Sequence, residues 1–235
     1  MPILSLLTDL RRVLAPPRCI RCLKEDTWHC TGCQEQMRLF EQRCIVCSEK
    51  QPSGRTCSPC REDTPLTGAL SAGPYAAPYL RRGISWLKFR SVKDVAPALA
   101  YLTLPHLSKI SPITTLQKSA VFVPIPLHAR REHTRGFNQA EEIARALQGY
   151  VHISVLQALA RPKATHTQAR LPNELRKQNI TDAFSVIQDI PPATTHVILV
   201  DDVTTSGNTI SAAAMVLRPS LPSRTQMWGL TVARG

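Results

Sequence analysis

The sequence predicts an α/β protein in two parts: a small cysteine-rich module over residues 1–64, and a parallel sheet flanked by helices over residues 65–235. Three observations support this fold class. All eight cysteines lie within the first 60 residues, as four C-x-x-C pairs. Beyond them, short apolar runs alternate with helical patterns, which is typical of parallel strands joined by helices. One of these runs ends in two acidic residues and a glycine-containing turn, where open α/β sheets bind ligands.

Size and charge restrict the class of protein further. The chain has 235 residues, 43% of them hydrophobic, which suffices for one or two domains. Its formal charge of +12 excludes the class of acidic disordered tail proteins and favours an anionic partner such as phosphate or nucleic acid. No apolar segment approaches the roughly 20 residues of a membrane span, and the N-terminal charge order does not fit a secretion signal. We therefore expect a cytoplasmic protein with no membrane span.

The cysteine pairs predict metal sites. A C-x-x-C turn makes two thiolates face one point, and two such turns complete the tetrahedral all-sulfur shell that Zn²⁺ accepts. Eight thiolates therefore predict two structural zinc sites, whose closed shells leave no open position for chemistry. The expected ligands are Cys19, Cys22, Cys30, Cys33, Cys44, Cys47, Cys57 and Cys60.

The four pairs can be combined in more than one way. Consecutive pairing puts the first four cysteines on one zinc and the last four on the other, and we favour it because short zinc motifs are compact. Interleaved pairing is the alternative. Disulfides would need an oxidising compartment, and an iron–sulfur cluster ranks behind zinc. Because few apolar residues accompany the cysteines, we expect this double zinc-ribbon module to depend on metal for folding.

The positive charge is concentrated after the module. Residues 1–67 carry a formal +2 and residues 68–235 a formal +10. Eight thiolates with two Zn²⁺ bring the net charge of residues 1–67 to about −2, so the sequence gives little support for nucleic-acid binding by this part alone. The densest basic run, residues 81–93, contains Trp86 and Phe89 and could present cations and a ring to single-stranded nucleic acid. We favour the simpler interpretation, a surface helix with one buried stripe and a solvated basic face.

A pass along the chain gives the expected elements. Residues 61–67 form a linker, a loop surrounds Pro112, and a long polar stretch covers residues 161–182. The expected strands are residues 69–75, 120–125, 196–200 and 227–232, and the expected helices are residues 3–14, the basic run, 95–107, 138–147 and 206–217.

Residues 197–210 contain the most informative motif. An apolar strand ends in Asp201 and Asp202, and a hydroxyl-rich turn with Gly207 opens a helix. Backbone N–H groups and hydroxyls converge at such a helix N-terminus, which makes the turn a phosphate cradle. Its expected members are Thr204, Thr205, Ser206, Gly207, Asn208 and Thr209.

The two carboxylates need a different partner, because they would repel phosphate. Asp201 and Asp202 are suited to accept hydrogen bonds from sugar hydroxyls about one ribose ring away from the cradle. Together the two features predict a ribose 5-phosphate site. The alternative is an incidental acidic pair beside an ordinary helix cap.

A second segment, residues 124–139, follows a strand and opens a helix. Its arginines lie where a second anionic group would bind, and arginine suits bidentate phosphate contact. Alone, it would be a basic loop with a helix cap. Next to the first motif it predicts a pyrophosphate site with Arg131 and Arg135, and with Leu127 and His128 among the ligand-binding residues. We assign no general base.

These motifs resemble those of a known family. The turn at residues 201–209 is similar to the phosphoribosyl pyrophosphate loop of type I phosphoribosyltransferases. Joined with the cysteine pairs, the Pro-x-Pro-Leu-His…Arg-Gly-Phe-Asn-Gln element and a Thr-x-x-Gln…Arg-x-x-Asn loop between residues 165 and 179, it identifies the chain as a member of the ComF family. That family includes bacterial competence proteins and GntX-type proteins. Lys163 stands where its members usually have Arg, and Ser206 where Thr is common.

The resemblance implies a cytosolic protein with a type I phosphoribosyltransferase-like domain, linked to DNA uptake or to growth on DNA as a nutrient. It implies that Asp201 and Asp202 hold the ribose hydroxyls and that the cradle holds the 5-phosphate. It also implies Mg²⁺, bound mainly through pyrophosphate and sugar oxygens, and departure of pyrophosphate through an oxocarbenium-like state. It does not supply the acceptor.

Three functional hypotheses follow. The first is a Mg²⁺-dependent phosphoribosyltransferase in which Arg131 and Arg135 neutralise the pyrophosphate. The second is a non-catalytic module that senses phosphoribosyl pyrophosphate or a nucleotide and binds single-stranded DNA or a DNA-uptake partner. The third makes the zinc ribbons a docking or oligomerisation element. The sequence leaves the acceptor, turnover and oligomeric state open.

Overall fold

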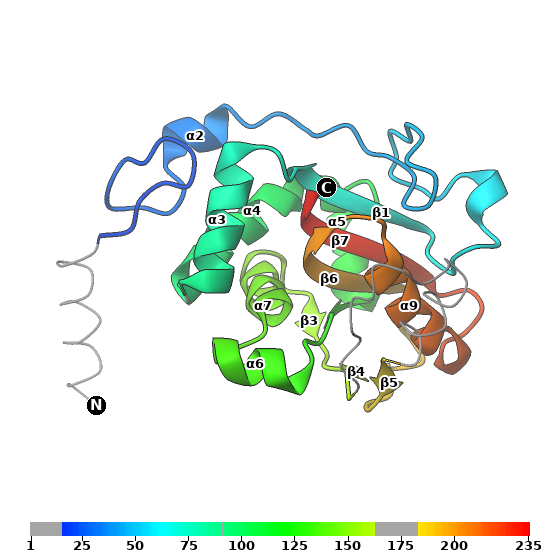
Figure 1. Cartoon of the computed structure of the whole chain (residues 1–235). Helices are drawn as coiled ribbons and strands as arrows, with labels where there is room; N and C mark the ends of the chain where they lie inside the picture. Colours follow the sequence, from blue (N-terminus) through cyan, green and yellow to red (C-terminus); the bar gives the residue numbers. More distant parts are fainter. Residues whose placement is uncertain (1–15, 91, 163–182) are drawn as a thin grey trace, which may run out of the picture.

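The computed structural model describes residues 16–90, 92–162 and 183–235. Its centre is a five-stranded sheet with the order β1-β7-β6-β2-β3, in which every neighbouring pair is parallel (Figure 1). The predicted α/β fold is therefore confirmed. The strands are β1 (Gly68–Pro74), β2 (Ala120–Pro124), β3 (Ser154–Val155), β6 (His196–Thr204) and β7 (Gln226–Arg234), and a small antiparallel pair is formed by β4 (Leu159–Ala160) and β5 (Ser185–Val186).

The helices match the expected pattern in part. The expected helix 3–14 and the loop at residues 165–179 lie outside the described residues. Short 3-10 turns occur at Ser58–Cys60, Lys93–Val95 and Arg218–Ser220. The α-helices are α2 (Thr31–Glu35), α3 (Pro78–Phe89), α4 (Ala96–Leu107), α5 (Ile113–Ser119), α6 (Ala129–Arg135), α7 (Gln139–Val151) and α9 (Asn208–Leu217).

Three local features differ from the predictions. The loop expected around Pro112 is present over residues 108–112, but the helix α5, which begins directly after Pro112 as its N-cap, was not expected. The segment before Asn138 contains the extra helix α6, which ends at Gly136. Strand β6 continues to Thr204, so Asp201 and Asp202 lie inside the strand, and α9 starts at Asn208 because Gly207 has a positive φ of 75°.

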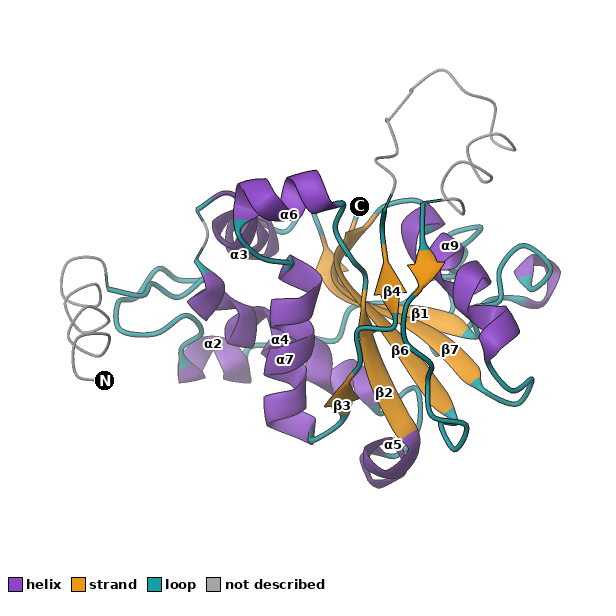
Figure 2. Cartoon of the chain, turned by 90° about the horizontal axis from the view of Figure 1, so that it is seen from below, coloured by secondary structure: helices purple, strands orange, loops and turns teal. Residues whose placement is uncertain are grey.

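Both faces of the sheet are buried. Ile198 and Val200 of β6 pack in the cluster that includes α3, α4 and α7, whereas Val197 and Leu199 pack in the cluster that includes α9. A strand covered on both faces reads as a continuous apolar run, which is why residues 197–200 show no alternation. Figure 2 shows α3, α4 and α7 on one side of the sheet and α9 on the other.

The cysteine-rich segment packs along the β1 side of the sheet (Figure 1). Ile20 joins one core cluster and Ile45 the other. Gln42 is 2% exposed; its Nε2 donates to the Ser71 carbonyl and its Oε1 accepts from the Ser71 N–H, both at 2.9 Å. The side chain thus satisfies backbone groups of the edge strand β1, which would otherwise be free to pair with another chain.

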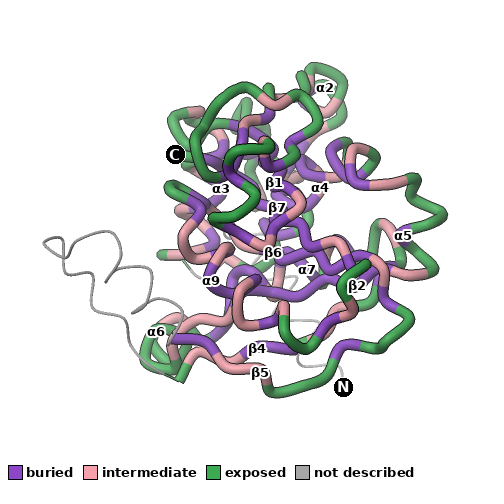
Figure 3. The backbone as a smooth tube through the Cα atoms, turned by 90° about the vertical axis from the view of Figure 1, so that its right-hand side faces the viewer, coloured by how far each residue is buried: buried purple, intermediate pink, exposed green. Residues whose placement is uncertain are grey.

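Exposure is uneven over the structure. Figure 3 shows the strands as mainly buried, with the exposed residues gathered in loops, in α6 and in parts of the cysteine-rich segment. The segment expected as a linker, residues 61–67, is partly buried: the Thr64 hydroxyl donates to Ser211 Oγ at 3.1 Å, and Thr56 Oγ1 donates to the Leu66 carbonyl at 2.7 Å. Of the helices in the described ranges, none is long and apolar enough to cross a membrane.

We expect Gln42→Leu to lower the free energy of unfolding by about 1–3 kcal/mol, because it leaves the buried N–H and carbonyl of Ser71 without their partner. Urea unfolding at fixed zinc concentration measures the change. Gln148→Leu, at an exposed position of α7, is the matched control. Equal midpoints for the two variants would contradict the role assigned to Gln42.

Candidate functional site

The connections of the sheet define where a ligand can enter. Strands β2 and β6 are parallel neighbours, with Pro124 opposite Val200. The chain leaving β2 continues to α7 on one face, and the chain leaving β6 continues to α9 on the other. The two connections diverge at the carboxyl ends of these strands, and such a switch point is where open α/β sheets bind ligands. Both segments expected to bind ligand, residues 124–139 and 201–209, begin there.

The phosphate cradle lies at the start of α9. Gly207 is its N-cap, and no side chain caps the helix, so the first-turn N–H groups remain available for an anion. Thr205 and Ser206 are exposed beside it. Thr204 differs from the other expected members: it is 5% exposed and belongs to β6. Its carbonyl accepts from the Gly235 N–H at 2.8 Å, so Thr204 supports the turn.

The acidic pair lies just before the cradle. Asp201 Oδ1 accepts a hydrogen bond from the Asp202 N–H at 2.8 Å. The pKa of Asp201 is raised to about 7, mainly by burial and secondly by the negative charge of Asp202. The hydrogen bond from the Asp202 N–H and the positive charges of Lys88 and Arg161 lower this pKa, but their effect is smaller. Asp201 therefore changes its charge near neutral pH.

Lys88 on α3 is a further residue of this site, whereas its place in the basic run had made it, with Arg90, a candidate DNA contact. Its Nζ forms an ion pair with Asp202 Oδ1 at 2.8 Å, and the two side chains are 21% and 9% exposed. The predicted buried stripe of α3 is confirmed at Leu80, Ile84 and Leu87, but Lys88 does not belong to the solvated basic face. It lies next to the stripe at the end of the helix and neutralises Asp202. Without this partner, the buried charge of Asp202 would destabilise the fold.

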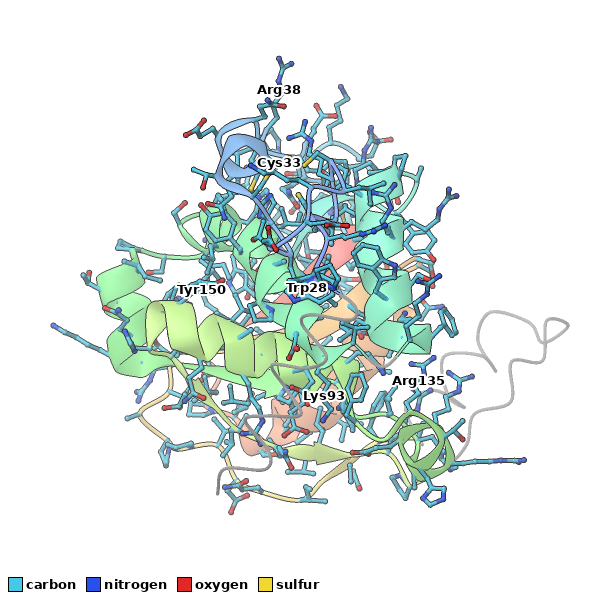
Figure 4. The ribbon with its side chains drawn as sticks, turned by 90° about the vertical axis from the view of Figure 1, so that its left-hand side faces the viewer. Trp28, Cys33, Arg38, Lys93, Arg135 and Tyr150 are labelled. Carbon is cyan, nitrogen blue, oxygen red and sulfur yellow. The ribbon has the colours of Figure 1, made fainter. Side chains whose placement is uncertain are left out.

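The arginines expected to bind pyrophosphate are placed differently from one another. Arg135, labelled in Figure 4, is partly buried. It donates to Gln139 Oε1 at 2.8 Å, and its Cζ lies 5.8 Å from the centroid of the Phe89 ring. Arg131 is exposed on α6. Burial and then the Arg131 charge lower the pKa of Arg161, whereas Asp201 raises it, so Arg161 is coupled electrostatically to both.

His128 and Leu127 occupy the loop after β2. His128 is the N-cap of α6, and its Nδ1 accepts from the Arg130 N–H at 3.2 Å, which gives it a structural role in the loop. A pocket of about 290 Å³ opens at this loop. Its lining includes Pro124, Leu127, Glu132, Asn138, Gln157 and Arg161.

The cysteines form two clusters with consecutive pairing. Cys19, Cys22, Cys30 and Cys33 make the first cluster, and Cys44, Cys47, Cys57 and Cys60 make the second; within each, all sulfurs lie within 4.8 Å of one another. The Cys22–Cys30 and Cys47–Cys57 sulfurs are 3.6 and 3.5 Å apart. A tetrahedral Zn²⁺ shell has sulfur–sulfur edges of about 3.8 Å, so both clusters could hold zinc.

The thiol pKa values favour a cation in each cluster. Burial acts to raise the pKa of Cys19, but hydrogen bonds from backbone N–H groups, including that of Cys22, outweigh it and lower the pKa to about 6. Burial and contacts with the other three sulfurs raise the pKa of Cys33 to about 12. One thiol ionises easily, and its negative charge makes ionisation of the other three unfavourable. A bound divalent cation would compensate this repulsion and allow all four thiols to ionise.

Comparison with known proteins supports the family. No family model matches the chain. It is 32% identical over 203 residues to DNA utilization protein YhgH of Escherichia coli (strain K12), covering 86% of this chain and 88% of that protein. It is also 31% identical to Competence protein F of Haemophilus influenzae, over 92% of this chain and 97% of that protein. The chain belongs to the ComF family. Competence protein ComFC of Bacillus subtilis is 26% identical to it, over 85% of this chain and 82% of that protein.

The raised pKa of Asp201 predicts a pH-dependent stability of this ComF-family chain. The folded-state pKa of about 7 exceeds the ordinary 3.8. The stabilising contribution of the protonated carboxyl is therefore fully present below about pH 4 and is lost as pH rises through about 7. We expect the urea midpoint of Asp201→Asn to rise relative to that of wild type as pH increases from about 5.5 to 8.

Asp189→Asn, at an exposed position, is the control, and its difference from wild type should stay constant over this range. Both variants retain the cysteine clusters, so any pH dependence that the clusters cause is the same in each and cancels in the comparison. A constant difference for Asp201→Asn would contradict the raised pKa.

Proposed function

We propose that this chain binds phosphoribosyl pyrophosphate with Mg²⁺ at the switch point between β2 and β6, and transfers its phosphoribosyl group during the uptake or use of DNA. The principal supporting observation is that β6 carries the acidic pair, and the turn that follows it leads to an uncapped helix N-terminus. The names of its relatives, which refer to DNA utilization and competence, support the biological setting.

In this proposal, different residues bind the 5-phosphate, the ribose and the pyrophosphate. The N–H groups and hydroxyls of residues 205–209 hold the 5-phosphate. Asp202 and Asp201 accept hydrogen bonds from the ribose hydroxyls, and Lys88 is released from Asp202 as they do so. Arg131 on α6 and Arg161, directly after β4, have charges that interact, and both face the pyrophosphate. Arg135 supports the loop through its contacts with Gln139 and Phe89.

Transfer breaks the bond between the anomeric carbon and pyrophosphate and forms a bond from that carbon to the acceptor. Cations fixed beside the departing pyrophosphate stabilise its negative charge, which is the largest effect that these residues can supply. Mg²⁺ would add further charge neutralisation, held mainly by oxygens of the ligand.

Calorimetric titration of the zinc-loaded protein with phosphoribosyl pyrophosphate and Mg²⁺ tests the proposal. We expect wild type to bind and the double variant Asp201→Asn/Asp202→Asn to lose about 100-fold in affinity, because two charge-assisted hydrogen bonds are removed. Asp189→Asn is the matched control for loss of one charge at an exposed position. Absence of wild-type binding at millimolar ligand would sink the proposal.

Binding alone would leave a sensor as the alternative to a transferase. The release of pyrophosphate in the presence of candidate acceptors separates the two, because only a transferase releases it. Loss of that release in Asp202→Asn would assign it to this site.

A second candidate function is the binding of single-stranded DNA on α3. Phe89 is 74% exposed and Arg90 follows it, while Arg135 stacks on the same ring. An exposed ring beside cations is the usual platform for unpaired bases. Lys88 is left out of this surface because it pairs with Asp202.

We expect Phe89→Ser/Arg90→Ser to weaken oligonucleotide binding about tenfold, since stacking contributes about 1–3 kcal/mol per base. Fluorescence anisotropy at two salt concentrations measures it. Ile187→Ser, at a residue that is 61% exposed, is the control. Unchanged binding in the α3 variant would exclude this surface.

A further inference from the structure

The second cysteine cluster lies directly behind the phosphate cradle. Ile45, in the turn between Cys44 and Cys47, is 2% exposed and packs against Gly207. The contact is so close that a Cβ at Gly207 would lie 2.6 Å from Ile45 Cγ1 and 3.0 Å from the Ile45 carbonyl oxygen. Gly207 is therefore required by this neighbour as well as by its φ of 75°.

A second connection runs through the end of β7. Arg234 is 8% exposed, and its guanidinium donates to the Arg43 carbonyl at 2.9 Å, the Cys44 carbonyl at 2.8 Å and Ser48 Oγ at 3.0 Å. Arg234 is paired with Thr204 in the sheet. The same cysteine turn is thus fixed to the strand ends that support the cradle.

The first cluster has the same shape and different neighbours. Ile20 occupies in it the position that Ile45 occupies in the second cluster, directly after the first cysteine. Its carbonyl accepts from Arg82 Nη1 at 2.7 Å, and its side chain packs at Gly83 in the middle of α3. Both contacts are on α3, whereas the contacts of Ile45 are on the cradle.

We propose that metal binding by the second cluster positions the phosphate cradle, so that the affinity for a ribose phosphate depends on the metal of this cluster and not on that of the first. The inference rests on the ligand assigned under the proposed function. The four sulfur–metal bonds fix the turn that carries Ile45, and Ile45 and Arg234 transmit this order to Gly207 and Thr204. A cradle ordered before the ligand arrives binds more tightly than one that the ligand must order.

The test compares Cys47→Ser with Cys22→Ser. Both cysteines are exposed and hold equivalent positions in their clusters, so each variant removes one ligand of one cluster. Zinc content is measured for each protein, and the zinc-loaded chain is titrated with ribose 5-phosphate alone and with phosphoribosyl pyrophosphate plus Mg²⁺. We expect at least about tenfold weaker binding of both ligands by Cys47→Ser and less than about threefold weakening by Cys22→Ser.

Amide hydrogen exchange gives a readout that does not involve ligand. We expect exchange at residues 205–210 to accelerate in Cys47→Ser and to remain as in wild type in Cys22→Ser. Unchanged affinity in a Cys47→Ser protein that has lost the zinc of its second cluster would overturn the inference, and so would equal weakening in the two variants.

Ile45→Ala keeps every cysteine and decides the question if Cys47→Ser does not fold. We expect it to retain the zinc content of wild type and to weaken both ligands, whereas Ile20→Ala should leave affinity unchanged in the folded fraction. Wild-type affinity in Ile45→Ala would count against the inference alone. Absence of binding by wild type itself would instead refute the proposed function.

Discussion

The central strand β6 is the constraint on which the rest of the structure depends. It is hydrogen-bonded to β2 on one side and to β7 on the other, and helices cover both of its faces. The part of the strand that is paired on both sides must be apolar, so polar side chains are tolerated only beyond it. The pairing with β2 ends at Val200, and Asp201 and Asp202 follow in the part of β6 that is paired with β7 alone, just before the cradle. The position of the site is thus set by the same burial that stabilises the domain.

Charges at this buried end require compensation, and their partners come from other parts of the chain. Lys88 of α3 pairs with Asp202, while Asp201 remains half protonated near neutral pH because burial and its neighbour oppose its ionisation. The cysteine clusters also concentrate ionisable groups. Four thiols this close together need a divalent cation in order to ionise together. At the end of β6 the cation is Lys88, and in each cysteine cluster four sulfurs lie close enough together for one metal ion to bind all of them.

Local sequence patterns predicted the features that are encoded locally. The C-x-x-C spacing, the apolar run of residues 197–200 and the turn at Gly207 each lie within a few residues, and the structure places them as sheet, turn and consecutive clusters. The missed features depend on contacts between distant segments. Arg234 and Cys44 are 190 residues apart in sequence, and neither the ion pair of Lys88 nor the packing of Ile45 on Gly207 leaves a periodic signal. Helix α5 was missed because Pro112 was interpreted as a breaker when it begins a helix.

The most direct measurement of the central claim is an NMR titration of the isotope-labelled, zinc-loaded protein with ribose 5-phosphate. If the end of β6 and the start of α9 form a ribose-phosphate site, the largest amide shifts will fall at residues 205–210 and at Asp201 and Asp202. The carboxyl titration of Asp201 will also move away from pH 7 as its surroundings change. Shifts confined to the basic face of α3, or none at millimolar ligand, would contradict the claim.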